Sequence, residues 1–167
     1  MKTRVIGFVF LFVLQIAPGL AAEVPAAREL YSAIIGADSV ELVRLNPSQR
    51  NIFGQKRSND ASGTIDGRKI VSARVAKDRA DILRLAASLQ KSVEKADPEL
   101  IAMCFNPRHA LRLRSGSTES VIVVCFECLG GYSRGISGAS SFHLEGTAES
   151  EWEDVFAKNG ISRIKKG

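Results

Sequence analysis

The sequence predicts an α+β domain, in which a mostly antiparallel sheet of about 4–5 strands carries helices packed on one face. Apolar residues recur at helical spacing in three segments, and short runs rich in valine, isoleucine and leucine lie between them. The predicted order is α-β-β-α-β-β-β-α, which lacks the repeated βαβ units of a parallel sheet. The 167 residues suffice for one core, and a hydrophobic content of 45% excludes a mostly disordered chain.

Residues 1–22 have the three parts of a secretory signal peptide. A basic start precedes an apolar run of about 12 residues, which is shorter than the stretch of about 20 that crosses a bilayer. Small residues then offer a cleavage site at Ala21 or Ala22. We expect cleavage there, one mature domain over 23–167, and a periplasmic or secreted protein whose only membrane contact is the signal peptide. An uncleaved anchor is the alternative.

The charge balance of the mature chain is small. The whole sequence has a formal charge of +5, but Lys2 and Arg4 belong to the leader, so the remainder carries 21 basic and 18 acidic residues. This excess is too small to indicate a nucleic-acid partner.

A helix, two strands and a long loop are predicted for the start of the mature chain. Pro25 is well placed to open the helix, and Gly36 can close it. Strands are predicted over 39–45 and 68–75 from their content of Val, Ile and Leu. The segment 46–67 between them is rich in Gly, Ser and Asn and ends in an Asp-Gly turn, so we expect a loop.

The second helix has the clearest periodic pattern in the chain. Asp78 can cap its start, and Asp97-Pro98 marks its end. One face of this helix is apolar and needs a partner surface, most simply a sheet: Ile82, Leu85, Ala86, Leu89 and Val93.

The next predicted elements are a hairpin and an edge strand. The strands of the hairpin cover 109–114 and 119–126, with a turn at 115–118. The continuous apolar run at 121–124 is typical of a central strand buried on both faces. A glycine- and serine-rich segment follows, with an edge strand around 139–144.

A last helix is predicted to start at a capping box made of Ser150 and Glu153 and to end at Gly160. Trp152, Val155 and Phe156 share one face of it. The acidic residues at its start complement the helix dipole, which we prefer to a metal or acid/base role: Glu149, Glu151, Glu153 and Asp154.

The hairpin geometry gathers the unusual side chains of this chain at one place. A turn centred between Gly116 and Ser117 pairs residues whose numbers add up to 233, so Arg114 lies across from Glu119. The same register brings four chemistry-bearing residues to the open end of the hairpin: Cys104, His109, Cys125 and Cys128.

A disulfide is the first interpretation of this cluster. Cys104 could bond to Cys125 or to Cys128, because adjacent strands place Cα atoms within bridging range. Closing a loop of about 20 residues would stabilise the fold by about 3 kcal/mol in the chain-entropy model. The third cysteine would stay free or pair with another molecule.

A structural zinc ion is the second interpretation, and zinc is the one cofactor that the pattern suggests. Cys104 and His109 form a C-x4-H half that faces the C-x2-C half formed by Cys125 and Cys128. In an ideal register, however, His109 shares its face of the sheet with Val124, while Cys125 points to the other side. A bulge near the preceding proline would be needed to bring the four ligands together.

Thiol chemistry is the third interpretation. A C-x-x-C pair can exchange disulfides when a helix N-terminus lowers one pKa, but here the pair leads into glycines. Cys104 and His109 are residue types that serve as nucleophile and base, although no orienting third group is evident. The cysteines can also be small apolar residues of the core with no reactive role. No phosphate-binding, dinucleotide-binding, zinc-protease or serine-hydrolase motif occurs in the sequence.

Arg108, Arg112 and Arg114 alternate along the first hairpin strand and could grip an anionic partner. The simpler interpretation is that they form the exposed side of the hairpin. His109 is by itself more often a hydrogen-bonded structural residue than a ligand.

The stretch C-F-N-P-R-H-A-L-R, followed by V-I-V-V-C-F-E-C, resembles a family of small bacterial exported proteins with a C-[FY]-x-P-x-H … C-F-x-C motif and no known activity. The resemblance covers Cys104 to Cys128 and implies that these positions act as one unit. We therefore expect an exported binding or structural module with an envelope or extracellular partner. A thiol-based or metal-dependent enzyme that uses the same four residues is the alternative.

Overall fold

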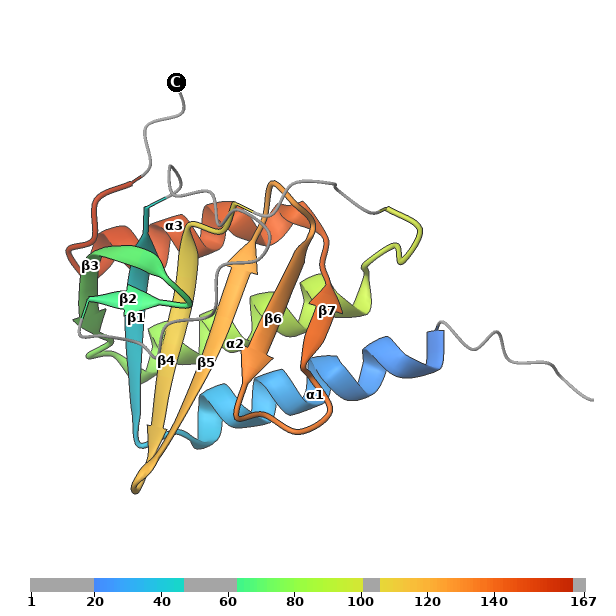
Figure 1. Ribbon diagram of the computed structural model, residues 1–167, viewed down its shortest axis with the longest axis horizontal. Coiled ribbons are helices and arrows are strands. Elements are labelled where there is room, and N and C mark those ends of the chain that lie inside the picture. Colours follow the sequence, from blue (N-terminus) through green and yellow to red (C-terminus); the bar gives the residue numbers. More distant parts are fainter. Residues whose placement is uncertain (1–19, 47–62, 101–105, 164–167) are drawn as a thin grey trace, which may run out of the picture.

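The computed structural model describes residues 20–46, 63–100 and 106–163 (Figure 1). The elements are, in order, α1 (Leu20–Gly36), β1 (Ser39–Leu45), β2 (Thr64–Ile65), β3 (Arg68–Val75), α2 (Arg79–Glu94), β4 (His109–Ser115), β5 (Thr118–Cys125), β6 (Gly130–Arg134), β7 (Ser141–His143), the 3₁₀ turn η1 (Gly146–Ala148) and α3 (Glu149–Lys158). They form an α+β fold, as predicted. No helix in the described segments is long and apolar enough to cross a bilayer.

The strands form one antiparallel sheet in the order β2-β3-β1-β4-β5-β6-β7. The sheet has seven strands, so the expected number of about 4–5 is wrong, and so is the predicted order of elements. The additional strands are β2, which lies inside the predicted loop 46–67, and β6. Glycine is typical of loops, but Gly131 is required by strand packing. A Cβ there would lie 2.4 Å from the ring of Phe142 and 2.6 Å from the carbonyl oxygen of Val123.

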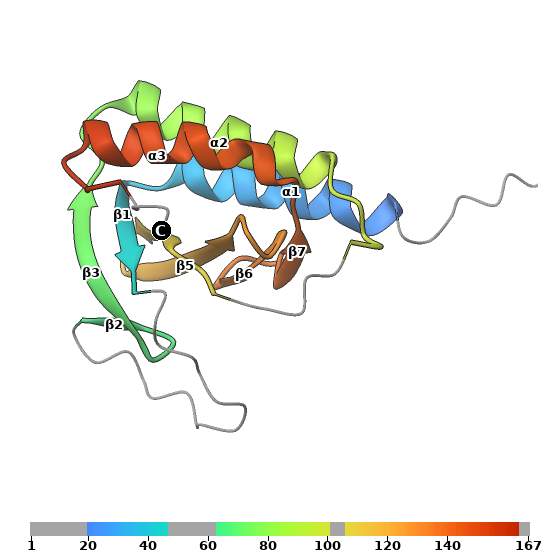
Figure 2. The same cartoon turned by 90° about the horizontal axis from the view of Figure 1, so that it is seen from above.

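The helices α1, α2 and α3 lie together on one face of the sheet (Figure 2), as predicted. The side chain of Asp78 accepts a hydrogen bond from the Ala80 amide at 2.9 Å, which confirms the predicted cap of α2. α1 begins at Leu20 and not at Pro25. Pro25 lies inside this helix near its start, where its missing N–H removes one backbone hydrogen bond.

The predicted register of the β4–β5 hairpin is confirmed. His109 pairs with Val124 and Arg114 pairs with Glu119, so the turn is centred between Gly116 and Ser117. Because side chains alternate along a strand, His109 and Val124 face the helices. The next residue, Cys125, therefore lies on the opposite side of β5.

A smaller apolar cluster covers the face opposite the helices. The β2–β3 hairpin curls over this face and packs Ile65 against Val121 and Val123 (Figure 2). Its Asp-Gly turn places Asp66 at a φ of 49°, and the hydroxyl of Tyr132 donates a hydrogen bond to that carboxylate. Burial is the main cause that raises the pKa of Tyr132, and Asp66 raises it further.

Candidate functional site

Three charged or titratable side chains meet in the core between the sheet and α3. Arg44 on β1 pairs in register with His109 on β4, and both side chains face the helices. Glu153 reaches them from α3. Arg44 is 5% exposed and His109 is 1% exposed. We refer to Arg44, His109 and Glu153 as the charge cluster.

The members of the charge cluster bond to one another. The Arg44 guanidinium donates from Nη1 and Nη2 to the two carboxylate oxygens of Glu153, at 2.7 and 2.9 Å. The His109 Nε2 atom lies 2.7 Å from Glu153 Oε1 and 2.7 Å from Arg44 Nη1. Since Nε2 holds either a proton or a lone pair, it donates to Glu153 or accepts from Arg44, but not both.

Aromatic rings enclose the imidazole of His109. The rings of Phe126, Trp152 and Phe156 stand edge-on to it, with centroid distances of 5.3, 6.1 and 5.2 Å. The guanidinium carbon of Arg44 lies 5.0 Å from the centre of the Phe156 ring, within cation–π range. These rings limit the access of water to the imidazole, so the hydrogen-bonded atoms of the charge cluster depend mainly on protein partners.

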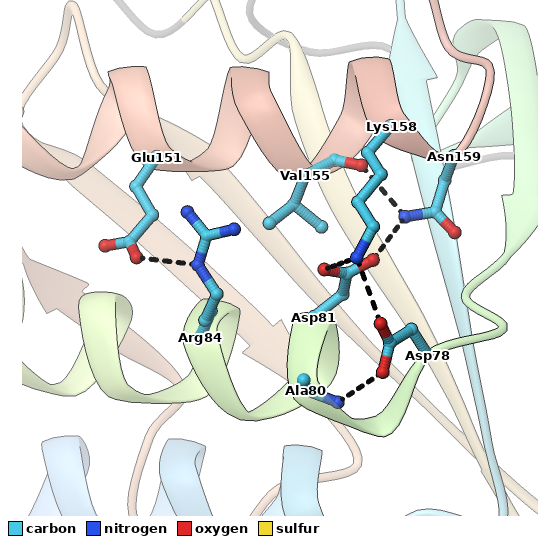
Figure 3. Close-up of polar contacts among 8 residues, drawn as sticks. All are labelled: Asp78, Ala80, Asp81, Arg84, Glu151, Val155, Lys158 and Asn159. Atoms are coloured by element: carbon cyan, nitrogen blue, oxygen red, sulfur yellow. Dashed lines mark hydrogen bonds and ion pairs between the residues drawn. The ribbon is translucent and has the colours of Figure 1, made fainter.

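Polar contacts join α2 to α3, the helix that carries Glu153 (Figure 3). Lys158 Nζ lies 3.0 Å from Asp78 Oδ2 and 2.9 Å from the buried Asp81 Oδ1. Asn159 donates to Asp81 at 3.1 Å and to the carbonyl of Val155 at 2.9 Å. These contacts fix the end of α3 against the start of α2.

The surroundings set the charge of each titratable member. Burial is the main cause that lowers the pKa of His109 from 6.5; the hydrogen bond with Glu153 opposes it, and the charge of Arg44 lowers the pKa further. Burial alone would raise the pKa of Glu153, but hydrogen bonds from His109 and Arg44 lower it from 4.5 to about 2. At neutral pH the charge cluster therefore holds a neutral imidazole and one Arg–Glu ion pair.

Acid is expected to destabilise the protein in two steps. Below pH 6.5 the unfolded chain protonates His109 while the native chain does not, so the free energy of unfolding falls as the pH falls. Below pH 4.5 the contribution of Glu153 is lost progressively towards pH about 2. Urea unfolding at several pH values measures both steps. The first step should be weaker in a His109→Gln variant, and an unchanged pH dependence in that variant would contradict the assignment.

A disulfide joins Cys125 and Cys128, with an S–S distance of 2.08 Å. The predicted bond from Cys104 to either of these residues is wrong, because both sulfur atoms are already bonded. Cys104 lies outside the described residues. The register explains the difference, since the tight turn that follows β5 brings the two cysteines of the C-x-x-C within a Cα distance of 5.1 Å. The Asn106 amide donates to Cys128 Sγ at 3.2 Å.

The three predicted zinc ligands that the structure describes, His109, Cys125 and Cys128, are engaged with other partners. His109 faces the helices and contacts Arg44 and Glu153, whereas alternation along β5 places Cys125 on the opposite side. Within the described part of the chain, no group of three or more His, Cys, Asp or Glu side chains could hold a metal ion. The recess beside His109 measures about 10 Å³, close to the volume of about 10–15 Å³ that one water needs.

Carboxylates neutralise the three arginines proposed to bind an anion. Arg112 and Arg114 lie on the face of β4 opposite the helices, and Arg108 precedes the strand. Their nearest carboxylates lie at 3.1 Å for Arg108 and Glu127, 2.6 Å for Arg112 and Glu41, and 3.5 Å for Arg114 and Glu119. The anion site therefore stays a prediction, and ion pairs already neutralise most of the charge of its three arginines.

The sequence patterns did not indicate that Arg44 and Glu153 belong to the candidate site. Glu153 is not the partner in a capping box: α3 starts at Glu149 with Ala148 as N-cap, and no side chain caps it. Alternation along β1 could have indicated Arg44, because it places this arginine on the face of Val40 and Leu42. A charged residue on an inward face needs a partner of opposite charge.

Comparison with protein-family models, with curated proteins and with solved structures finds no match for this chain. The resemblance carried by Cys104 to Cys128 therefore stays a prediction. What the chain can do has to be argued from its own geometry.

Proposed function

We propose that this protein is an exported module that acts by binding a partner of the envelope or the exterior, and that its buried polar groups serve as bonding partners for one another within the fold. One observation carries the proposal: the buried charge cluster and the two described cysteines are bonded among themselves in the interior. Arg44, His109 and Glu153 form a closed cluster, and Cys125 bonds to Cys128. The surface is then the part of the described molecule available to another chain.

Export is supported by the leader and by the disulfide. Cleavage after Ala22 would leave Pro25 in the first turn of α1, where proline is well tolerated. A bond between Cys125 and Cys128 is expected to persist in a periplasm or outside the cell, where thiols are oxidised.

A thiol enzyme is the rival proposal, favoured by the bonded C-x-x-C pair. Two observations count against it. Cys125 and Cys128 are only 2% and 6% exposed, and the pair leads into β6 and not into a helix whose N-terminus would lower a thiol pKa. Iodoacetamide labelling of the reduced protein at neutral pH separates the two, because an exchange enzyme has one fast-reacting thiol.

Intact mass after alkylation tests the proposal. The chain has three cysteines. Mature protein from the periplasmic fraction should start near Glu23, take one label without reductant and three after reduction and unfolding. A Cys104→Ser control should take none without reductant. Metal analysis accompanies the mass, since a zinc site would give one zinc ion per chain.

Labelling of all three thiols in the native protein, or retention of the leader in the purified chain, would overturn the proposal. A zinc ion that co-purifies in a one-to-one ratio would replace it with the metal interpretation.

A further inference from the structure

The outer side of β3 is an open sheet edge in the described part of the chain. β1 pairs with one side of β3, whereas β2 pairs with the other side only at Arg68 and Lys69. Ile70 still donates to the carbonyl of Gly63 at 2.8 Å. Among the described residues, no strand pairs with the outer side of β3 beyond that point.

The pairing of β3 with β1 is regular from Ser72 to Val75, and its register shifts at Val71. Arg74 pairs with Leu42 of β1, and the Ala76 amide donates to the carbonyl of Val40 at 2.9 Å. Because alternate residues of an antiparallel strand bond to opposite sides, Ala73 and Val75 direct their N–H and C=O groups away from β1. An added strand could form its ladder there.

Two apolar side chains are exposed along the edge, beside charged ones. Val71 is 60% exposed and Val75 is 54% exposed. A local contact covers part of the edge: Arg74 Nη1 donates to the carbonyl of Ala73 at 2.8 Å. An incoming strand would take over that carbonyl and release the guanidinium for an acidic group.

The charge around the edge selects the kind of partner. Arg74 and Lys77 are exposed at its end. The nearby acids are engaged elsewhere, since Glu41 lies 2.6 Å from Arg112 and Asp78 lies 3.0 Å from Lys158. A second copy paired antiparallel about Ala73 would set Lys69 against Lys77 of the other copy, which is unfavourable.

We propose that the outer edge of β3 binds an extended, acidic segment of a partner chain as an added strand. Main-chain bonds at Ala73 and Val75 hold the segment, apolar side chains cover Val71 and Val75, and acidic side chains meet Arg74 and Lys77. The inference rests on the proposed binding function and names the surface and the partner chemistry.

The test is fluorescence anisotropy with a labelled synthetic peptide that alternates valine and glutamate, added to the mature protein. A peptide that alternates valine and lysine is the control ligand. We expect the acidic peptide to bind, binding to weaken with salt, and amide exchange at Ala73 and Val75 to slow in the complex.

Three variants locate the binding. Ala73→Pro removes an outward N–H while keeping the bonds to β1, and should weaken binding about tenfold or more. Lys77→Glu should weaken it about two- to fivefold, because an exposed ion pair is lost. Lys91→Glu, the same charge change on α2, is the matched control and should bind like the wild type.

Binding of the basic peptide equal to that of the acidic one, or binding unchanged by both Ala73→Pro and Lys77→Glu, would overturn the inference. So would a dimer in sedimentation that Ala73→Pro dissociates, because a second copy would then occupy the edge. If the mass experiment succeeds and no peptide binds, the inference about β3 fails while the exported module stands.

Discussion

Replacing Glu153 by leucine is expected to lower the free energy of unfolding by about 3–5 kcal/mol, because it leaves the charge of the buried Arg44 without its partner. Urea unfolding followed by circular dichroism measures the change. Glu151→Leu is the matched control on the same helix. Its exposed ion pair with Arg84 spans 3.3 Å, so its loss should cost no more than about 1 kcal/mol.

Replacing the whole charge cluster should be far less harmful than removing one member. In the triple variant Arg44→Met, His109→Leu and Glu153→Leu no buried charge is left unpaired, and apolar side chains of similar volume fill the space. We expect its stability to lie within about 1 kcal/mol of the wild type, or above it. A triple variant as unstable as Glu153→Leu would show that the loss of stability in Glu153→Leu does not come from the unpaired charge of Arg44.

Truncating Trp152 to alanine is expected to cost about 3–5 kcal/mol, because its fully buried ring is the central aromatic contact of this core. Its centroid lies 5.4 Å from Phe126 and 6.1 Å from Phe156, and its Nε1 donates to Ser88 Oγ at 3.1 Å. Thermal and urea unfolding measure the loss.

A phenylalanine at position 152 separates ring packing from the hydrogen bond. Trp152→Phe keeps most of the aromatic surface but leaves Ser88 without the indole donor, so the loss should be clearly smaller than for alanine. Equal losses for the two variants would mean that the hydrogen bond, and not the packing of the ring, dominates at this position.

Local sequence patterns account for the parts of the fold that were predicted. The helix after Asp78 follows from its periodic apolar face and its cap, and the β4–β5 register follows from one short turn at Gly116. β6 was not predicted, because glycine in a strand reflects a close approach between neighbouring strands. That approach, between Gly131 and Phe142, depends on tertiary structure.

The candidate site was predicted only in part, for a similar reason. His109 was placed correctly at the hairpin end, but its partners lie 65 and 44 residues away in the chain. No local pattern joins Arg44 on β1 to Glu153 on α3. The predicted disulfide to Cys104 was wrong. The sequence spacing shows that Cys125 and Cys128 are near each other, but it does not show that the turn between them brings their sulfur atoms within bonding distance.

Nitrogen NMR of the imidazole of His109 during an acid titration tests most directly whether the charge cluster is a closed structural unit. The chain has two histidines, so a His109→Gln variant assigns the signals. The account predicts that His109 of the folded protein becomes protonated only below pH 6.5. A ring that protonates at or above pH 6.5 in the folded protein would show an accessible, charged histidine, and would contradict the account.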